Sequence, residues 1–348
     1  MKKLISLLLC TATLFALVAC SNQTSESSQS SSGGGSSTQQ QSSSGAEESE
    51  YAQYKIGMCT LNMSSPSQVL GYEGTLALAD ELGFELMSVD SEGSPEKQVT
   101  AIENFIQAGC DGIVISAVDG EALRYVIDTA REQGIKIYSR LNLAEDQYDL
   151  CTALDNYDLG WALGYNVGQY IVEKWGDEEI EVGILNYDKN VTMIDRREGI
   201  EDGLAETAPN CIVVDSQEGN ETDTGLVSTE SMLQAHPNIR VMLGVNDSGI
   251  LGAYEAFIQS GRTDPDTYLV AGIDCVPAAL NYIKQEDSIY QMTIYQDMYG
   301  YGYYGTYELL KLINGEDAKN VECTFEVVTH DNYESYVEVF EGLGYEFD

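Results

Sequence analysis

Short apolar runs alternate with longer amphipathic stretches along most of the chain. Pro95–Gln107, for example, carries Val99, Ile102 and Ile106 at helical spacing on one face. Short strands alternating with helices are typical of parallel sheets covered by helices on both faces, because parallel strands need crossover connections. The pattern therefore predicts an α/β fold. The predicted strands are Tyr54–Leu61, Phe84–Asp90, Gly112–Ala117, Ile135–Ser139, Glu181–Leu185, Cys211–Asp215, Val241–Val245 and Tyr268–Ile273.

An internal repeat suggests that the chain forms two similar lobes. The segment from Gln107 to Asp119 parallels the segment from Gln234 to Asp247 with one residue inserted, and each is followed by a helical stretch and another apolar run. A repeated unit of this kind needs its own sheet each time. Two lobes are therefore expected, although the match is short and convergence between α/β segments is the alternative explanation.

The N-terminal residues have the pattern of an export signal. Two lysines are followed by an apolar stretch, Leu4–Leu17, which is too short to cross a bilayer as a helix. Leu17-Val18-Ala19-Cys20 resembles the bacterial lipobox, in which the cysteine is acylated and becomes the new N-terminus. We expect residues 1–19 to be a lipoprotein signal peptide and Cys20 to carry the lipid. The alternative is an ordinary secretory signal with an incidental cysteine.

The signal is followed by a polar segment with no capacity to form a core. Between Ser21 and Glu50 the chain is mostly Ser, Gly, Gln and Thr, and no aliphatic residue is larger than Ala46. Such a composition cannot offset the entropy of ordering the chain, so residues 20–52 are expected to form a disordered linker after the lipidated cysteine. The remaining residues, 53–348, are more than one core comfortably holds, which again favours two lobes.

Composition excludes several classes of function. The chain has 57 acidic and 17 basic residues and a formal net charge of −40, which opposes binding to nucleic acid or to anionic headgroups. Its two histidines, His236 and His330, offer little material for a histidine metal site or a catalytic triad. We therefore expect no metal, no cofactor and no enzymatic activity, and contact with the membrane only through the lipid anchor.

The cysteines and one glycine motif leave less specific signals. No C-x-x-C pair occurs among the cysteines after the lipobox, and their spacing fits small buried residues as well as disulfides, so their pairing stays open. Gly300–Gly305 matches G-x-G-x-x-G, but no strand leads directly into it and no βαβ unit follows, as a dinucleotide site would require. The glycines are expected instead to let a tyrosine-rich helix pack closely at the junction of the lobes. The cysteines concerned are Cys59, Cys110, Cys151, Cys211, Cys275 and Cys323.

Polar residues concentrate where the apolar runs end. In open parallel sheets, ligands bind outside the carboxyl ends of the strands. Asparagines and aspartates at strand ends also serve as turn formers and helix caps, which explains Asp119 and Asp247 but not Arg140. The strand ends therefore predict a polar cleft. The residues concerned include Thr60, Asn62, Ser116, Ser139, Arg140, Asn246 and Asp274.

From Tyr54 to about Thr329 the sequence resembles the periplasmic ribose, galactose and related sugar-binding proteins of ABC transporters. The order of several short motifs carries the resemblance, among them Lys55-Ile56-Gly57, Leu82-Gly83-Phe84, Asp111-Gly112-Ile113-Val114-Ile115-Ser116, Val245-Asn246-Asp247 and Gly272-Ile273-Asp274. It implies a type I periplasmic binding protein, with two Rossmann-like lobes and parallel sheets. Its hinge would have three crossings, near Asp155, Gln296 and Val321–Thr324. Lobe 1 would contain about 53–155 and 297–322, and lobe 2 about 156–296 and 323–348.

The resemblance also implies a set of ligand-binding residues. Arg140 and Arg196 match arginines that clamp sugar hydroxyls in the family, and the planar guanidinium suits two neighbouring hydroxyl oxygens. Asp274 would accept hydrogen bonds from hydroxyls, while Asn246 and Gln296 could both donate and accept. The remaining positions that match family pocket residues are Asn62, Ser65, Ser116, Ser139 and Tyr187.

The sequence departs from the family in ways that leave the ligand open. Ser67 and Gln68 stand where the family stacks aromatic rings on the sugar, and Ser139 stands where ribose and galactose binders commonly place an aspartate. Two arginines then face one strong acceptor, which would tolerate an acidic or phosphorylated sugar. Stacking from other positions is an alternative to core packing for four aromatic residues: Tyr138, Tyr157, Trp161 and Tyr295.

Together these observations predict an extracytoplasmic, monomeric solute-binding protein that is anchored to the bacterial cell membrane by lipid. It would close two lobes around a small polar ligand, a monosaccharide or related polyol, and deliver it to the permease of an ABC transporter. The alternative function is a sensor of the same fold that presents its ligand to a membrane receptor without transport.

Overall fold

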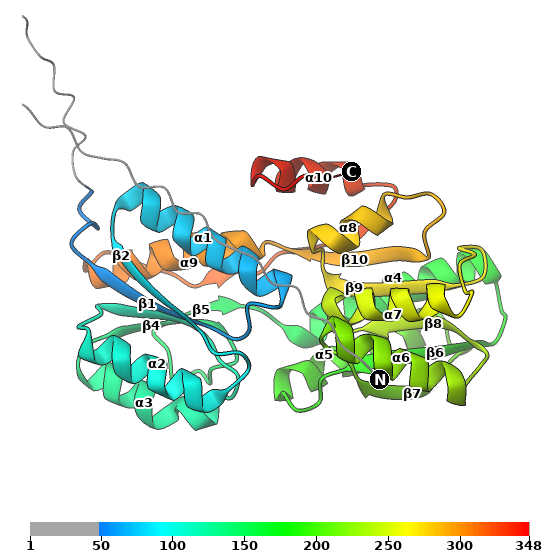
Figure 1. Ribbon diagram of the computed structural model, residues 1–348, viewed down its shortest axis with the longest axis horizontal. Helices are drawn as coiled ribbons and strands as arrows, with labels where there is room; N and C mark the ends of the chain where they lie inside the picture. Colours follow the sequence, from blue (N-terminus) through cyan, green and yellow to red (C-terminus); the bar gives the residue numbers. More distant parts are fainter. Residues whose placement is uncertain (1–48, 348) are drawn as a thin grey trace, which may run out of the picture. The chain divides into compact units, whose positions relative to one another are not determined.

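In the computed structural model, residues 49–347 are described, and they contain two six-stranded sheets (Figure 1). The predicted signal peptide, the predicted lipidation site Cys20 and most of the predicted linker lie outside these residues. We call each sheet with its covering helices a lobe. The alternation of strands and helices confirms the predicted two-lobed α/β fold.

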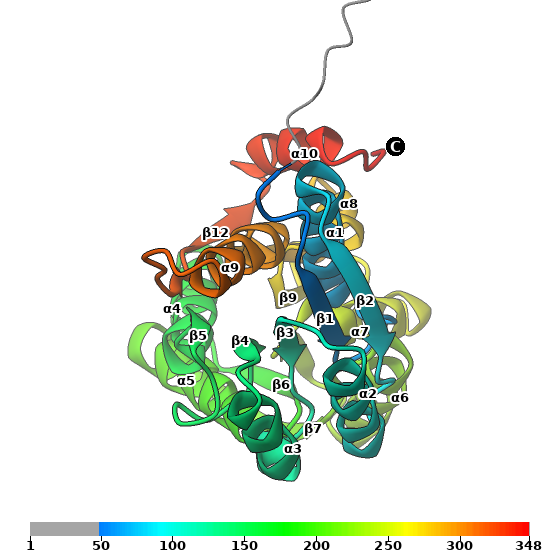
Figure 2. The same ribbon diagram turned by 90° about the vertical axis from the view of Figure 1, so that its left-hand side faces the viewer.

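Lobe 1 is built on a sheet with the strand order β11-β5-β4-β3-β1-β2, in which all neighbours are parallel. Helices α1 and α9 pack against each other on one face, and α2 and α3 pack together on the other (Figures 1 and 2). The strands are β1 (Lys55–Thr60), β2 (Glu85–Asp90), β3 (Gly112–Ser116), β4 (Lys136–Leu141), β5 (Leu150–Ala153) and β11 (Val321–Glu322). The helices are α1 (Pro66–Leu82), α2 (Pro95–Gln107), α3 (Gly120–Glu132) and α9 (Met298–Ile313).

Lobe 2 has the strand order β12-β10-β9-β8-β6-β7, and only the edge strand β12 is antiparallel to its neighbour. Helices α4 and α5 pack together on one face and α6 and α7 on the other. The strands are β6 (Ile180–Asn186), β7 (Cys211–Glu218), β8 (Ile239–Gly244), β9 (Leu269–Asp274), β10 (Tyr290–Gln296) and β12 (Phe325–Thr329). The helices are α4 (Asn156–Trp175), α5 (Val191–Thr207), α6 (Thr222–Ala235), α7 (Asp247–Gln259), α8 (Pro277–Ile283) and α10 (Tyr333–Gly342).

The chain passes between the two sheets at three places. It crosses after β5 into α4, after β10 into α9, and from β11 into β12. The crossings thus lie at residues 153–156, 296–298 and 322–325. The short strands β5 and β11 were not predicted, because four and two residues carry too little periodic signal to be recognised.

The glycines of the G-x-G-x-x-G motif lie inside helix α9, where they allow close packing. A Cβ atom on Gly302 would lie 1.9 Å from the carbonyl oxygen of Gly71 in α1, and one on Gly305 would lie 2.0 Å from the ring of Tyr138. Since the motif does not form a loop at a helix N-terminus, it has no cradle for a pyrophosphate. Its glycines hold α9 against α1 and the sheet of lobe 1.

None of the helices in residues 49–347 is both long enough and apolar enough to cross a membrane.

All six cysteines of residues 49–347 are free thiols, and Cys59, Cys110 and Cys275 are buried. Within the described part of the chain, these three cysteines therefore pack as small core residues.

Candidate functional site

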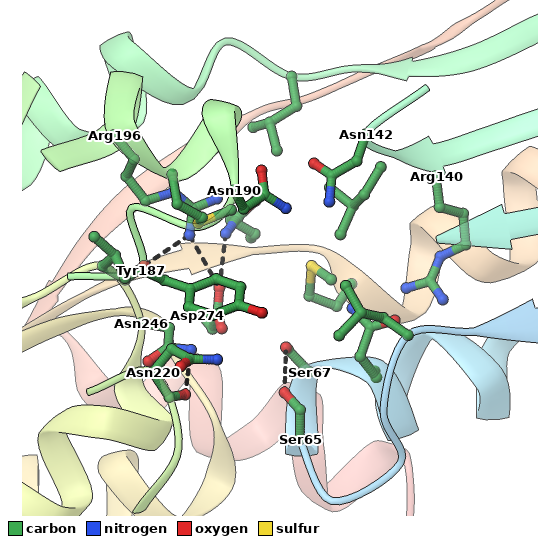
Figure 3. Close-up of a pocket in the computed structure, with 18 of the residues that line it drawn as sticks. Ser65, Ser67, Arg140, Asn142, Tyr187, Asn190, Arg196, Asn220, Asn246 and Asp274 are labelled. Carbon is green, nitrogen blue, oxygen red and sulfur yellow. Dashed lines mark hydrogen bonds and ion pairs between the residues drawn. The ribbon is translucent and has the colours of Figure 1, made fainter. Parts of the chain in front are cut away.

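A pocket lies between the two lobes, at the carboxyl ends of the strands in both sheets (Figure 3). It contains about 790 Å³ of empty space, part of which is open to solvent. The lining residues are Leu61, Ser65, Ser67, Gln68, Arg140, Leu141, Asn142, Leu154, Tyr187, Asn190, Met193, Arg196, Asn220, Glu221, Val245, Asn246, Asp274, Gln296, Met298 and Tyr301.

Most of the residues predicted to bind ligand line this pocket, and three do not. Ser139 lines a neighbouring cavity instead. Asn62 lies outside the lining and donates to Glu221 over 3.2 Å, and Ser116 is buried at the end of β3. The structure thus brings residues from both lobes together in one place. The predicted residues in the pocket are Ser65, Arg140, Tyr187, Arg196, Asn246, Asp274 and Gln296.

Asp274 ends strand β9 and is the buried acceptor of lobe 2. Its Oδ1 accepts a hydrogen bond of 2.9 Å from Nε2 of Gln296 and lies 3.9 Å from NH1 of Arg196. Burial raises the pKa of Asp274 to about 6, although the charge of Arg196 acts in the opposite direction. Hydrogen bonding from Ser67 of lobe 1 also lowers this pKa. The carboxylate is therefore ionised at neutral pH and can accept hydrogen bonds from ligand hydroxyls.

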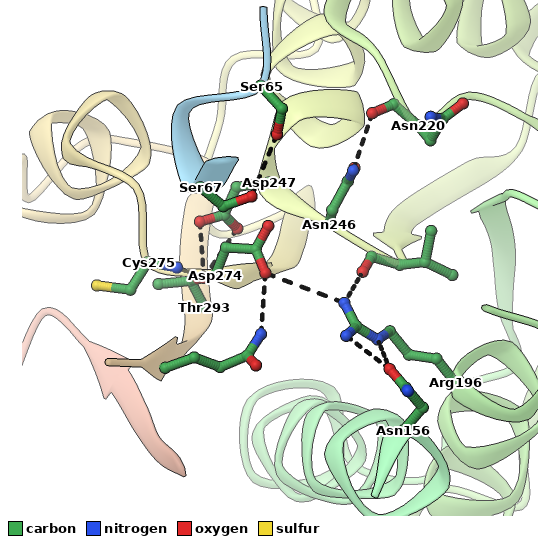
Figure 4. A network of polar contacts seen from close by, with 12 residues as sticks. Ser65, Ser67, Asn156, Arg196, Asn220, Asn246, Asp247, Asp274, Cys275 and Thr293 are labelled. Atoms are coloured by element: carbon green, nitrogen blue, oxygen red, sulfur yellow. Dashed lines mark hydrogen bonds and ion pairs between the residues drawn. The ribbon is translucent and has the colours of Figure 1, made fainter. Parts of the chain in front are cut away.

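The backbone around Asp274 is held in an uncommon conformation. Asp274 and Cys275 have φ angles of 115° and 52°, which side chains other than glycine rarely adopt. The buried carboxyl group of Asp247 accepts a hydrogen bond of 3.0 Å from the backbone nitrogen of Val276. It also accepts from Thr293, whose hydroxyl in turn accepts from the backbone nitrogen of Cys275 (Figure 4). Asp247 thus fixes the turn that aims Asp274 into the pocket.

Arg196 in α5 is buried and already has partners within lobe 2. Its Nε and NH2 donate to Oδ1 of Asn156 over 3.1 and 2.7 Å, and its NH1 donates to the carbonyl oxygen of Val245 over 2.8 Å. Its weak ion pair with Asp274 completes a network that joins α4, α5, β8 and β9 (Figure 4). This arrangement fixes the guanidinium in place as part of the pocket wall.

Arg140 in β4 lies on the opposite side of the pocket and has no such partners (Figure 3). It is 2% exposed, and its Nε, NH1 and NH2 atoms are buried without a hydrogen-bond partner. Gly71 of α1 makes room for it, since a Cβ atom there would lie 1.8 Å from NH2. Burial lowers the pKa of Arg140, but a guanidinium keeps its charge in proteins. The side chain is therefore poised for an acceptor that the protein does not supply.

Four polar lining residues were not predicted from the sequence. Asn142 and Asn190 follow strands β4 and β6, and Asn220 and Glu221 follow β7. The rule that ligands meet the carboxyl ends of strands could have found them, because each lies within a few residues of a strand end. The backbone carbonyl oxygen of Asn220 accepts a hydrogen bond of 2.8 Å from Nδ2 of Asn246.

Direct hydrogen bonds join the lobes on two sides of the pocket. Glu221 of lobe 2 accepts from Asn62 over 3.2 Å and from the hydroxyl of Ser64 over 3.3 Å. On another side, Thr192 of lobe 2 donates to Oδ1 of Asn142 over 2.7 Å. These contacts stabilise the approach of the two lobes.

The aromatic residues near the predicted site pack elsewhere. Tyr138 is buried and its hydroxyl is hydrogen-bonded to that of Thr152. Trp161 stacks on Tyr165, with ring centroids 4.5 Å apart. Tyr157 donates to Asp202, and the ring of Tyr295 packs against Tyr336. The pocket itself has the rings of Tyr187 and Tyr301. Core and surface packing therefore account for these four stacking candidates.

Residues 49–347 contain no cluster of three or more His, Cys, Asp or Glu side chains that could hold a metal ion. The chemistry of the pocket is that of hydrogen bonding. It offers two guanidinium groups, carboxylate and amide oxygens, and apolar surface from leucine, methionine and tyrosine side chains. Such a mixture binds a polar solute of small size.

Comparison with known proteins places the chain in a family. The periplasmic binding protein domain matches residues 56–317. The ribose import binding protein RbsB of Bacillus subtilis is 26% identical over 82% of this chain and 85% of its own length. The D-ribose/D-allose-binding protein of Pseudomonas aeruginosa is 30% identical over 71% of this chain and 79% of its own.

A solved structure gives the same result. An ABC transporter solute-binding protein from Actinobacillus succinogenes with bound D-allose has a TM-score of 0.74 and 25% identity, covering 82% of this chain and all of its own. These relatives are solute-binding proteins and not enzymes, in agreement with the prediction, and their family works outside the cytoplasm. The match over most of the chain, the two-lobed fold and the polar pocket between the lobes together show that this chain belongs to the periplasmic binding protein family.

Proposed function

We propose that this protein is a lipid-anchored solute-binding protein that captures a sugar or polyol between its two lobes and delivers it to the permease of an ABC transporter. The observation that carries the proposal is the convergence of buried polar groups from both lobes on one pocket, with Arg140 from lobe 1 and Arg196 and Asp274 from lobe 2. Relatives named for binding ribose and allose support the ligand class.

Binding works by closure of the lobes. A ligand held by Asp274 and Gln296 of lobe 2 would recruit Arg140 and the α1 residues of lobe 1, so it binds the closed form more tightly than the open form. The hydrogen bonds of Glu221 with Asn62 and Ser64 then stabilise the closed form. A permease could recognise the closed form through surfaces of both lobes.

The test is a ligand screen with the purified protein. Thermal unfolding is followed with D-ribose, D-allose, other monosaccharides, polyols and sugar acids, and each hit is titrated by calorimetry. At least one member of the panel is expected to raise the melting temperature and to bind in a one-to-one ratio. Failure of the whole panel would refute the proposed ligand class.

Anchoring and delivery are tested separately. Replacing Cys20 with serine is expected to move the protein from the membrane fraction to the medium, while ligand binding by the folded part is unchanged. If the C20S protein stays in the membrane fraction, the lipid anchor is refuted. Delivery predicts that ligand strengthens capture of an ABC permease in a pull-down from membranes, and capture of a receptor alone would instead favour a sensor.

A further inference from the structure

Arg140 is the one buried cation of the pocket whose charge no carboxylate balances. All three of its nitrogen atoms are buried and unpartnered, whereas Arg196 has Asn156, the Val245 carbonyl and Asp274. Ser139, the residue before Arg140 in β4, supplies no charge. A buried charge without a partner is strongly unfavourable, so the ligand must complete this site.

The unpartnered buried atoms of the pocket outline what the ligand must offer. Arg140 needs acceptors, while Oε1 of Gln68 and Oε1 of Gln296 are buried acceptors that lack donors. Hydroxyl groups can donate to both glutamine oxygens and to Asp274. A carboxylate pairs with Arg140 better than a hydroxyl does, because it balances the charge of the guanidinium and its two oxygens match the fork of guanidinium donors.

We infer that the ligand is a sugar acid, whose single carboxylate binds Arg140 while its hydroxyls bind Asp274, Gln68 and Gln296. This inference rests on the proposed function and narrows its ligand class. A second cavity also borders Arg140 and contributes about 1290 Å³ of empty space, part of it open solvent, so a substituent has room beside the guanidinium.

A carboxylate fits the charge of the site better than a phosphate. Phosphate monoesters carry roughly −1.5 to −2 charges at neutral pH, whereas Arg140 offers one unbalanced positive charge. Lys189, which borders the second cavity, is already paired with Glu218 over 2.8 Å. A sugar phosphate would therefore leave negative charge unbalanced in the buried part of the site.

The net charge of the chain cannot explain a preference for an acid. At −40, the long-range field of the protein repels anions, so any preference for the acid over its neutral parent must arise in the pocket. This makes matched pairs of ligands an informative test.

The experiment titrates the purified full chain with three pairs by calorimetry: D-galactose and D-galacturonate, D-glucose and D-glucuronate, and D-ribose and D-ribonate. D-ribose 5-phosphate is added as the phosphate probe. At least one acid is expected to bind roughly 10-fold or more tightly than its neutral parent, from the strength of charge-assisted hydrogen bonds. The acid is also expected to bind more tightly than the phosphate.

Arg140→Gln is expected to abolish this preference, so that acid and parent bind with affinities within about threefold of each other. Arg124→Gln is the matched control, because it removes the same charge from a half-buried arginine of lobe 1 that is paired with Glu121 and Asp146. Without ligand, R140Q is expected to unfold at the same or a higher temperature than the unmodified protein, since it removes an unbalanced buried charge. A fold defect is thereby distinguished from a lost contact.

Tighter binding of neutral parents than of their acids would overturn the inference and leave the proposed function intact. Preference for the phosphate would overturn the assignment of a carboxylate. Equal weakening of acid and parent in R140Q would show that Arg140 contacts hydroxyls only, and would also overturn it. If no sugar acid binds while a neutral sugar or polyol of the wider panel does, the inference fails and the proposed function stands. If no member of either set binds, both fail.

Discussion

Ligand affinity should depend on the ionisation of Asp274, and the structure fixes the direction. Burial raises the pKa of this carboxyl to about 6 in the ligand-free protein. If ligand hydroxyls donate to the ionised form, affinity is constant well above pH 6 and falls as the pH drops through this value. About nine-tenths of Asp274 is protonated one unit below its pKa, so affinity at pH 5 should be about 10-fold lower than at pH 7.

The effect on folding has the opposite sign, which separates loss of binding from loss of structure. Because the pKa of Asp274 in the folded protein lies above its ordinary value of 3.8, the folded state binds the proton of this carboxyl group more tightly than the unfolded state does. The contribution of Asp274 to stability is therefore present at low pH and is lost as the pH rises through about 6. Weaker binding at pH 5 would thus accompany no loss of stability from this group.

The assay is calorimetric titration of the best-binding sugar between pH 5 and pH 8, with thermal unfolding recorded in the same buffers. Asp274→Asn keeps the size of the side chain and should remove the fall in affinity near pH 6, with affinity about 10-fold below the plateau of the unmodified protein. His236→Gln is the control, because His236 is a histidine outside the pocket lining. An unchanged pH profile in D274N would refute the role assigned to Asp274.

Three further predictions concern groups that support the pocket. Gly71→Ala should push the guanidinium of Arg140 aside, because its Cβ atom would lie 1.8 Å from NH2, and should weaken ligand binding about 10-fold by calorimetry with little change in melting temperature. Glu221→Ala should remove two hydrogen bonds between the lobes, enlarge the ligand-free protein in small-angle X-ray scattering, and weaken binding by about fivefold. Asp247→Ala should leave buried donors such as the Val276 nitrogen unpaired and lower the free energy of unfolding by about 3 kcal/mol in urea denaturation.

Each of these variants has a matched control. Gly342→Ala adds the same methyl group at a helix end where nothing lies within 4 Å, and should leave binding unchanged. Glu218→Ala removes a lobe 2 acid that pairs with Lys189 of the same lobe. Asp128→Ala makes the same substitution as Asp247→Ala at an exposed carboxylate of α3. Normal binding by G71A, an E221A protein as compact as E218A, or a D247A protein as stable as D128A would contradict these predictions.

Much of the fold follows from local sequence patterns. The strands β1 to β4 and β6 to β9 lie within a few residues of the predicted apolar runs, and α2 has the predicted bounds Pro95–Gln107. These elements could be predicted because the side-chain periods of strands and helices differ, and because each element is long enough to show its period. The edge strand β12 escaped prediction, since its side chains are mostly partly exposed and it is fixed by pairing with β10.

By itself, the sequence determined the two-lobed α/β fold and the strand ends at which a ligand could bind, with Arg140 and Asp274 among them. Only the tertiary structure decided how the charges there are paired. Arg196 meets Asn156, which is 40 residues away along the chain, whereas Arg140 meets no acceptor at all. The periodic pattern shows where a strand ends and which residues follow it. Hydrogen bonding, however, depends on side chains that distant segments bring within about 3 Å of each other, and no local pattern encodes that distance.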